Sequence, residues 1–139
     1  MLGVVCIANG YAQEIEPQQE INIDDLGDVS DEFQEYFFEA LKQRAITNYD
    51  KAVEALDKCV ALDAKPNALY LELGKNYLDL KLFDKAEENL EKVIAVHPND
   101  KFVLELLFNT YFKEQKYSKS IGVLEKLVGF NTMLSLIHI

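Results

Sequence analysis

The residue types that most often carry out catalysis or bind metals are scarce in this 139-residue sequence. It has two histidines, His97 and His138, and two cysteines, Cys6 and Cys59. None of them has the spacing of a Ser-His-Asp set or of a Cys/His metal site, and no glycine-rich phosphate loop is present. The sequence therefore predicts no catalytic residue, no metal ligand, no cofactor and no small-molecule substrate. We expect that the protein is not an enzyme.

The negative charge is concentrated near the N-terminus. Residues 1–35 contain no Lys or Arg, whereas the other 104 residues hold all 14 bases and 15 of the 24 acids. A nucleic-acid-binding surface needs clustered basic residues, so nucleic acid is excluded as an expected partner. We interpret residues 13–30 as an acidic linker, because runs of like charge are usually solvated; an acidic recognition tail is the alternative.

Residues 1–12 resemble the later part of a secretory signal peptide. An apolar stretch, too short to span a bilayer, runs from Leu2 to Ala8, and small residues follow at the spacing that a signal peptidase accepts. We expect cleavage after Ala12 and export to the bacterial periplasm or cell envelope. A cytoplasmic protein with an apolar start is the alternative.

The sequence repeats itself with a period of about 34 residues, the strongest organising signal that it contains. Residues of the same kind recur at this spacing along three units, with aromatic, lysine and leucine positions all in register. The recurring sets are Tyr49, Phe83 and Tyr117; Lys51, Lys85 and Lys119; and Leu56, Leu90 and Leu124.

The pattern of each unit predicts two helices joined by a tight turn. In the second unit Tyr70, Leu73, Gly74 and Tyr77 recur at steps of three and four, which places them on one face of a helix. Pro98 ends the unit. Helices are predicted at 31–46, 49–62, 67–80, 83–96, 100–114 and 117–130, which makes the fold class all-α.

These residues resemble the tetratricopeptide repeat family. Residues 67–100 carry nearly all of its preferred positions, namely Tyr70, Leu73, Gly74, Tyr77, Ala86, Leu90, Val93 and Pro98. The resemblance implies an α-solenoid over residues 31–133, with units at 33–66, 67–100 and 101–133. Gly74 and Ala86 are expected to let the helices of one pair approach closely.

The resemblance also implies a concave groove, lined by the first helix of each unit, that binds a protein or peptide. The family's groove positions fall here on Phe37, Leu41, Arg44, Leu71, Lys75, Leu78, Phe102, Asn109, Phe112 and Lys113, and also on Gln34, Ala45, Ala68, Asp79 and Glu105. Apolar side chains in this set would suit an extended or helical peptide with apolar anchors. The alternative for individual members is burial between helices.

The C-terminal end departs from the repeat. Thr132 stands where the second unit has Pro98, and residues 134–139 break the periodicity, so we interpret them as a non-native tail. No polar capping helix follows the third unit, which allows self-association through that end. The leading hypothesis for function is a protein-interaction module. The alternative is the repeat arm of a larger envelope enzyme or transport machine that continues after residue 133.

Overall fold

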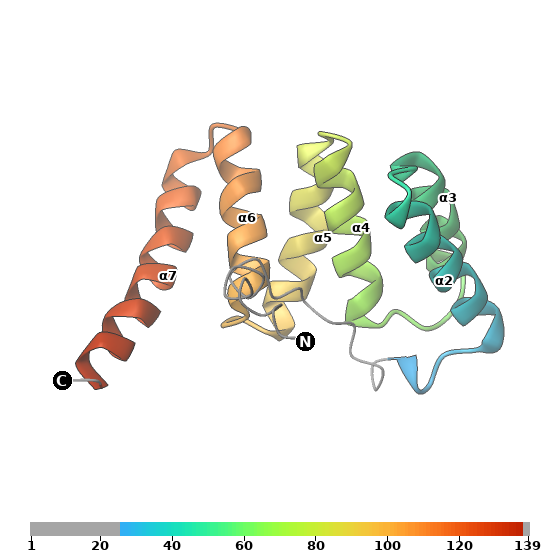
Figure 1. The fold of residues 1–139 in the computed structure, drawn as a ribbon, viewed down its shortest axis with the longest axis horizontal. Coiled ribbons are helices and arrows are strands. Elements are labelled where there is room, and N and C mark those ends of the chain that lie inside the picture. The colour runs from blue at the N-terminus through green and yellow to red at the C-terminus, as the bar shows by residue number, and fades with distance from the viewer. Residues whose placement is uncertain (1–25, 138–139) are drawn as a thin grey trace, which may run out of the picture.

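A computed structural model describes residues 26–137, with side chains to residue 129. These residues form six helices and no strand: α2 (Asp31–Ala45), α3 (Tyr49–Val60), α4 (Asn67–Asp79), α5 (Phe83–Val96), α6 (Lys101–Lys113) and α7 (Tyr117–Ile137). The helices stand side by side in chain order, from α2 and α3 at one end of the row to α7 at the other (Figure 1). The predicted all-α solenoid of three helix pairs is confirmed.

The observed helix boundaries lie within two residues of the predicted ones, except at the end of α7. We expected this helix to end near residue 130, but it continues to Ile137. In the second unit Pro98 follows closely after the end of α5 at Val96. Thr132 occupies the equivalent position in the third unit and keeps its backbone N–H, so nothing there forces the helix to end.

The predicted linker at 13–30 is wrong for its last five residues. Leu26 is only 6% exposed and packs in the same cluster as Phe33 and Phe37, with Val29 against it. The Ser30 Oγ accepts a hydrogen bond from the Phe33 N–H at 3.1 Å and caps α2. The fold therefore begins by Leu26. The predicted signal peptide and residues 13–25 of the linker lie outside the described residues.

The turn between the two helices of each pair has the same backbone conformation three times. Thr47, Lys81 and Gln115, which are equivalent residues of the repeat, have φ values of 61°, 62° and 63°. The N–H of the next residue then bonds back to the helix, as Leu82 does to the carbonyl of Tyr77 at 2.9 Å. The repeat in the sequence is thus a repeat in the backbone.

The core consists of two clusters that bridge neighbouring helix pairs. The first joins α2 and α3 to α4 through residues such as Phe33, Leu56 and Leu69, and the second joins α4 and α5 to α6 through residues such as Leu90 and Val103. Each pair therefore buries its apolar side chains partly against the next pair, as stacked repeats do.

Gly74 permits the close approach of α4 and α5 that the sequence predicted. A Cβ atom at this position would lie 2.7 Å from Cγ and 2.6 Å from Cδ2 of Leu90. Leu90 is itself fully buried, so it has little room to move. A residue with a side chain at position 74 would push the two helices apart.

Lysine ammonium groups lie over tyrosine rings at recurring positions of the helix pairs. Within the first two units, Lys58 lies 5.3 Å from the ring centre of Tyr36 and Lys92 lies 4.8 Å from that of Tyr70. A second set recurs in the last two units, where Lys85 contacts Tyr77 and Lys119 contacts Tyr111. These cation–π contacts explain why lysine and tyrosine recur together in the sequence.

None of the helices described between residues 26 and 137 has both the length and the apolar character needed to cross a membrane.

Candidate binding groove

The first helices of the three units share one pocket. Arg44 of α2, Lys75, Leu78 and Asp79 of α4, and Phe102 and Leu106 of α6 line a depression of about 160 Å³. Four of the ten principal groove residues predicted from the sequence meet here, namely Arg44, Lys75, Leu78 and Phe102. The pocket is continuous across three units, which no single helix pair could form alone.

The two cations in this pocket are already paired with acids. The Arg44 guanidinium lies 2.8 Å from the carboxylate of Asp79, and the Lys75 ammonium lies 2.5 Å from that of Glu72. Arg44 also donates a hydrogen bond to Oδ1 of Asn76 at 3.4 Å. The polar part of the pocket is therefore a set of paired charges of both signs.

Leu106 is the pocket residue that the predicted groove set omitted. It follows Phe102 by one helical turn on α6, so the two side chains lie on one face of that helix. This spacing was readable in the sequence and would have identified Leu106 once Phe102 was chosen.

The structure places two predicted groove residues in the core instead. Phe37 is fully buried and stacks on Phe33 with ring centres 5.8 Å apart. Leu71 is 8% exposed and belongs to the cluster that includes Leu90. The prediction that these two line an open groove is wrong, because stacking of the next helix pair covers the face of the first helix on which they lie. Leu41 is partly buried and packs against the first cluster.

The last three predicted groove residues lie outside the pocket. Asn109, Phe112 and Lys113 are exposed near the C-terminal end of α6 and do not line the depression. The Phe112 ring packs edge-on against Tyr117, with centres 5.7 Å apart. They are surface residues of α6 outside the pocket, and they therefore serve as controls.

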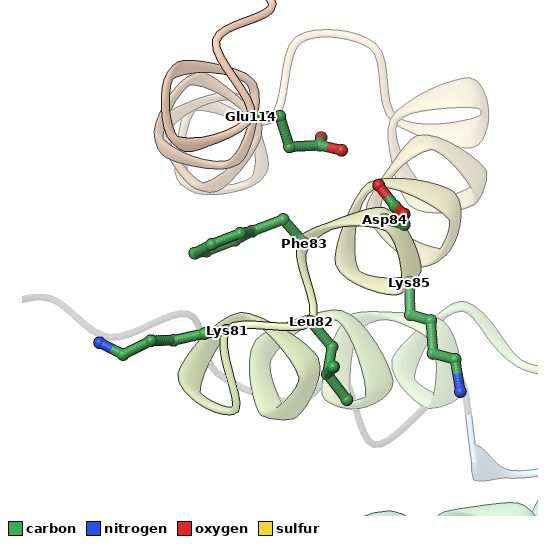
Figure 2. Close-up of a pocket in the computed structure, with 6 residues that line it drawn as sticks. All are labelled: Lys81, Leu82, Phe83, Asp84, Lys85 and Glu114. Carbon is green, nitrogen blue, oxygen red and sulfur yellow. The ribbon is translucent and has the colours of Figure 1, made fainter.

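A second, larger pocket of about 330 Å³ lies where the α4–α5 turn approaches the end of α6. Figure 2 shows its lining residues Lys81, Leu82, Phe83, Asp84, Lys85 and Glu114, with the carboxylates of Asp84 and Glu114 pointing toward one another. Burial raises the pKa of Glu114, and the neighbouring carboxylates of Asp84 and Glu87 raise it further, against the opposing effect of Lys116. Lys81 and Lys85 point away from this carboxyl pair in the view.

Glu87 has the opposite electrostatic environment a short distance away. Although burial alone would raise the pKa of its carboxyl, hydrogen bonds from Lys116 and Lys119 lower it. The two ammonium groups lie 2.5 Å and 3.1 Å from its oxygens. These bonds join α5 to the start of α7 and fix the third helix pair on the second.

No group of three or more His, Cys, Asp or Glu side chains within the described part of the chain could hold a metal ion. The thiol of Cys59 is fully buried, lies 3.6 Å from the carbonyl oxygen of Phe33, and has its pKa raised by burial to about 11. A nucleophilic cysteine needs a lowered pKa and access to solvent. Cys59 has neither and serves as a core residue.

The fold defines a class of protein, the α-helical repeat proteins built from stacked helix pairs. A family model for the tetratricopeptide repeat matches residues 43–66 and 68–100. Over these residues the helix pairs are similar to tetratricopeptide repeats, a family that is typically non-catalytic and binds proteins or peptides.

Solved structures of similar fold include two of MamA. A mutant form of MamA is 27% identical with a TM-score of 0.60, over 72% of this chain and 58% of that one. The structure titled MamA MSR-1 C2 is 28% identical with a TM-score of 0.61, over 72% of this chain and 57% of that one. The chain thus spans less than two thirds of either structure. No curated protein sequence matches it.

Proposed function

We propose that this chain is a non-catalytic interaction module that binds a peptide segment of a partner protein in the pocket shared by α2, α4 and α6. The observation that carries the proposal is the pocket itself, because it joins the first helices of all three units. A ligand lying along it would contact each repeat in turn.

The lining indicates the chemistry of the ligand. Leu78, Phe102 and Leu106 offer a partly exposed apolar surface, which suits one or two apolar anchor residues of an extended or helical peptide. Arg44 and Asp79 lie beside that surface and can each exchange part of their mutual ion pair for a hydrogen bond to the ligand. A peptide with an apolar anchor flanked by charged or polar residues fits this arrangement.

The test is a selection of peptides from a random display library on the full chain, followed by affinity measurements on the selected sequences. The informative variant is Phe102→Ala, which removes the largest apolar side chain of the pocket. Its matched control is Phe112→Ala, because Phe112 lies on the same helix, is exposed and stands outside the pocket. We expect the first change to weaken binding about tenfold or more and the second to leave it nearly unchanged.

A charge change provides an independent comparison. Lys75→Glu reverses a charge that lines the pocket, whereas Lys113→Glu reverses one on the exposed surface of α6. The proposal predicts that only the first alters which peptides are selected. Equal effects of both members of a pair, with thermal unfolding confirming that all variants are folded, would remove the groove assignment.

The cellular location is a separate part of this proposal. Export to the periplasm or cell envelope rests on the apolar stretch from Leu2 to Ala8, and N-terminal sequencing of the protein from its native cells tests cleavage after Ala12. Self-association through the third unit is the alternative use of its apolar C-terminal helix, and sedimentation over a range of concentrations tests it.

A further inference from the structure

The last described helix carries a row of exposed apolar side chains. Tyr117, Ile121, Leu124 and Val128 of α7 are separated by steps of four, three and four residues, so they form one stripe along the helix. Between 43% and 55% of the surface of each is exposed. We call these four residues the α7 stripe.

Equivalent positions in the other units show how such a stripe is covered. Leu56 of α3 and Leu90 of α5 correspond to Leu124, and both are fully buried whereas Leu124 is 43% exposed. The residues that bury them belong in part to the next first helix: Leu69 of α4 packs in the cluster of Leu56, and Val103 of α6 packs in that of Leu90. Leu124 therefore occupies a position that the molecule buries twice elsewhere against the next first helix, although Val60, the equivalent of Val128 in α3, is itself 39% exposed.

The covering helices share a definite pattern. On α4 the residues are Leu69, Leu73 and Tyr77, and on α6 they are Val103, Leu107 and Tyr111, both sets at steps of four. The tyrosine also meets an acid of the preceding unit. The Tyr111 hydroxyl donates a hydrogen bond to Oε2 of Glu91 at 2.5 Å. The pKa of Tyr77 is raised mainly by burial and also by the negative charge of the nearby Asp57 carboxylate.

The same acid position is present on α7. Glu125 corresponds to Glu91 and Asp57 in the repeat and lies next to Leu124 in the sequence. Glu125 is exposed. Leu124 and this carboxylate together correspond to Leu56 and Asp57 of α3, which lie close to Leu73 and Tyr77 of α4.

A second copy of the chain stacked head to tail does not supply the complement. Its α2 would take the place of α4 or α6, but α2 has Glu35, Glu39 and Gln43 where those helices have two aliphatic residues and a tyrosine. Burying the carboxylates of Glu35 and Glu39 against Ile121 and Leu124 would be strongly unfavourable. The charges of α2 therefore oppose a continuous filament of this chain.

We propose that the α7 stripe binds a partner helix that carries Leu or Val, Leu and Tyr at positions i, i+4 and i+8, with the tyrosine hydroxyl bonded to Glu125. The helix docks as α4 does on α3 and as α6 does on α5. Helix α7 lies at the end of the row of helices (Figure 1). None of the four stripe residues lines the pocket of the groove.

The probe is a synthetic peptide with the sequence of residues 66–80, which contains Leu69, Leu73 and Tyr77 and is added to the full chain. The control is the same peptide with the substitutions Leu69→Asp and Leu73→Asp. On the chain, Leu124→Asp breaks the stripe, and Asn99→Asp adds the same charge at an exposed position in the loop before α6. Binding is followed by fluorescence anisotropy of a labelled peptide, and oligomeric state by sedimentation.

We expect the peptide to bind the unchanged chain and the Asn99→Asp variant equally, and the Leu124→Asp variant about tenfold or more weakly. The control peptide should not bind. Equal binding to all three chains, or no binding at any, would overturn the proposal. A dimer of the chain alone that Leu124→Asp abolishes would also overturn it, because a second copy would then be the occupant. Groove variants leave this result unaffected, so the two proposals fail separately.

Discussion

The guanidinium of Arg44 lies 2.8 Å from the carboxylate of Asp79 and links the first helix of one repeat to the first helix of the next. The side chains are 27% and 40% exposed, so water weakens their attraction. This ion pair therefore orients two groove side chains more than it stabilises the fold.

We predict that Asp79→Asn lowers the free energy of unfolding by less than about 1 kcal/mol, as is usual for ion pairs near a surface. Urea unfolding at low and high salt measures the change, and a double-mutant cycle with Arg44→Gln isolates the pair. Lys42→Gln, which removes the more exposed pair with Glu39 at 3.1 Å, is the control and should have an even smaller effect. A loss of several kcal/mol would show that the pair holds the repeats together.

Substitution of Gly74 tests the close approach of α4 and α5. Alanine has a higher helix propensity than glycine by about 1 kcal/mol, but its Cβ would overlap Leu90, and overpacking costs about 1–3 kcal/mol. We expect Gly74→Ala to destabilise the protein on balance. Gly122→Ala is the control, because nothing lies within 4 Å of a Cβ there, and it should stabilise α7. Stabilisation by both changes would contradict the contact.

The turns at Thr47, Lys81 and Gln115 predict a gain from glycine. A non-glycine residue at φ near 62° is strained by contact of its Cβ with the backbone, by about 1–2 kcal/mol. Glycine relieves this strain, but part of the resulting stabilisation is lost because glycine makes the unfolded chain more flexible. We expect Lys81→Gly to stabilise the protein by about 0.5–1 kcal/mol in chemical denaturation.

Two comparisons make the turn prediction specific. Lys51→Gly, at an exposed position inside α3, should destabilise by about 1 kcal/mol, because there glycine only weakens a helix. Lys81→Val should also destabilise, since a β-branched residue tolerates positive φ poorly. The same sign for both glycine variants would mean that the backbone at Lys81 is unstrained.

The sequence predicted the architecture well because small and apolar residues recur in it at a fixed spacing. Gly74 and Ala86 are small residues at positions where close helix packing needs them, and the close approach of α4 and α5 is found as expected, with Leu90 against Gly74. The boundaries of the helix pairs followed from Pro98 and from the turn residues. The extension of α7 to Ile137 was not predicted. A proline such as Pro98 indicates where a helix ends, whereas Thr132 at the equivalent position does not indicate how far the helix continues.

The groove was predicted less well, because which face of a helix remains open depends on how the repeats stack. Phe37 and Leu78 are both apolar residues on first helices, yet Phe37 is buried and Leu78 lines the pocket. Likewise the sequence shows that Arg44 is basic but not that Asp79 of the next repeat pairs with it. Which of these residues remain exposed and which charges pair depends on the distances between repeats, and residue types alone do not give these distances.

The buried thiol of Cys59 predicts slow reaction with alkylating reagents. Burial raises its pKa from the ordinary value of 9.0 to about 11, so the native thiol stays protonated at pH 8. We expect mass spectrometry to find Cys59 unmodified after a short treatment at pH 8 and fully modified in denaturant. Cys6, the other cysteine, is distinguished by its own peptide. Rapid native modification of Cys59 would contradict its burial.

The same raised pKa makes stability depend on alkaline pH. The folded state holds this proton more tightly than the unfolded state, so the stabilisation is complete below about pH 9 and is lost as the pH rises through about 11. Tyr111 has a pKa raised by burial and by Glu91, and acts in the same direction. We expect the free energy of unfolding to fall over this range, and less steeply in Cys59→Ala. An unchanged slope would exclude the thiol as a cause.

The carboxyl pair of Asp84 and Glu114 predicts a gain in stability from a neutral side chain. Because folding raises the pKa of Glu114 above its ordinary value of 4.5, the stabilisation from its proton is present below pH 4.5 and is lost as the pH rises through the higher folded pKa. Glu114→Gln removes that loss and can donate an amide N–H to Asp84. It gives up the 3.3 Å contact with Lys116, which is half-exposed and contributes little.

We therefore expect Glu114→Gln to be more stable than the unchanged chain at pH 7, with the difference disappearing near pH 4, when unfolding is followed by circular dichroism at both values. Glu105→Gln, at an exposed glutamate of α6, the helix that Glu114 follows, is the control and should show no such difference. If Glu114→Gln were destabilising at pH 7, the attraction between Glu114 and Lys116 would outweigh the repulsion from Asp84. The pocket in Figure 2 would then be held together by that ion pair and not strained by two carboxylates.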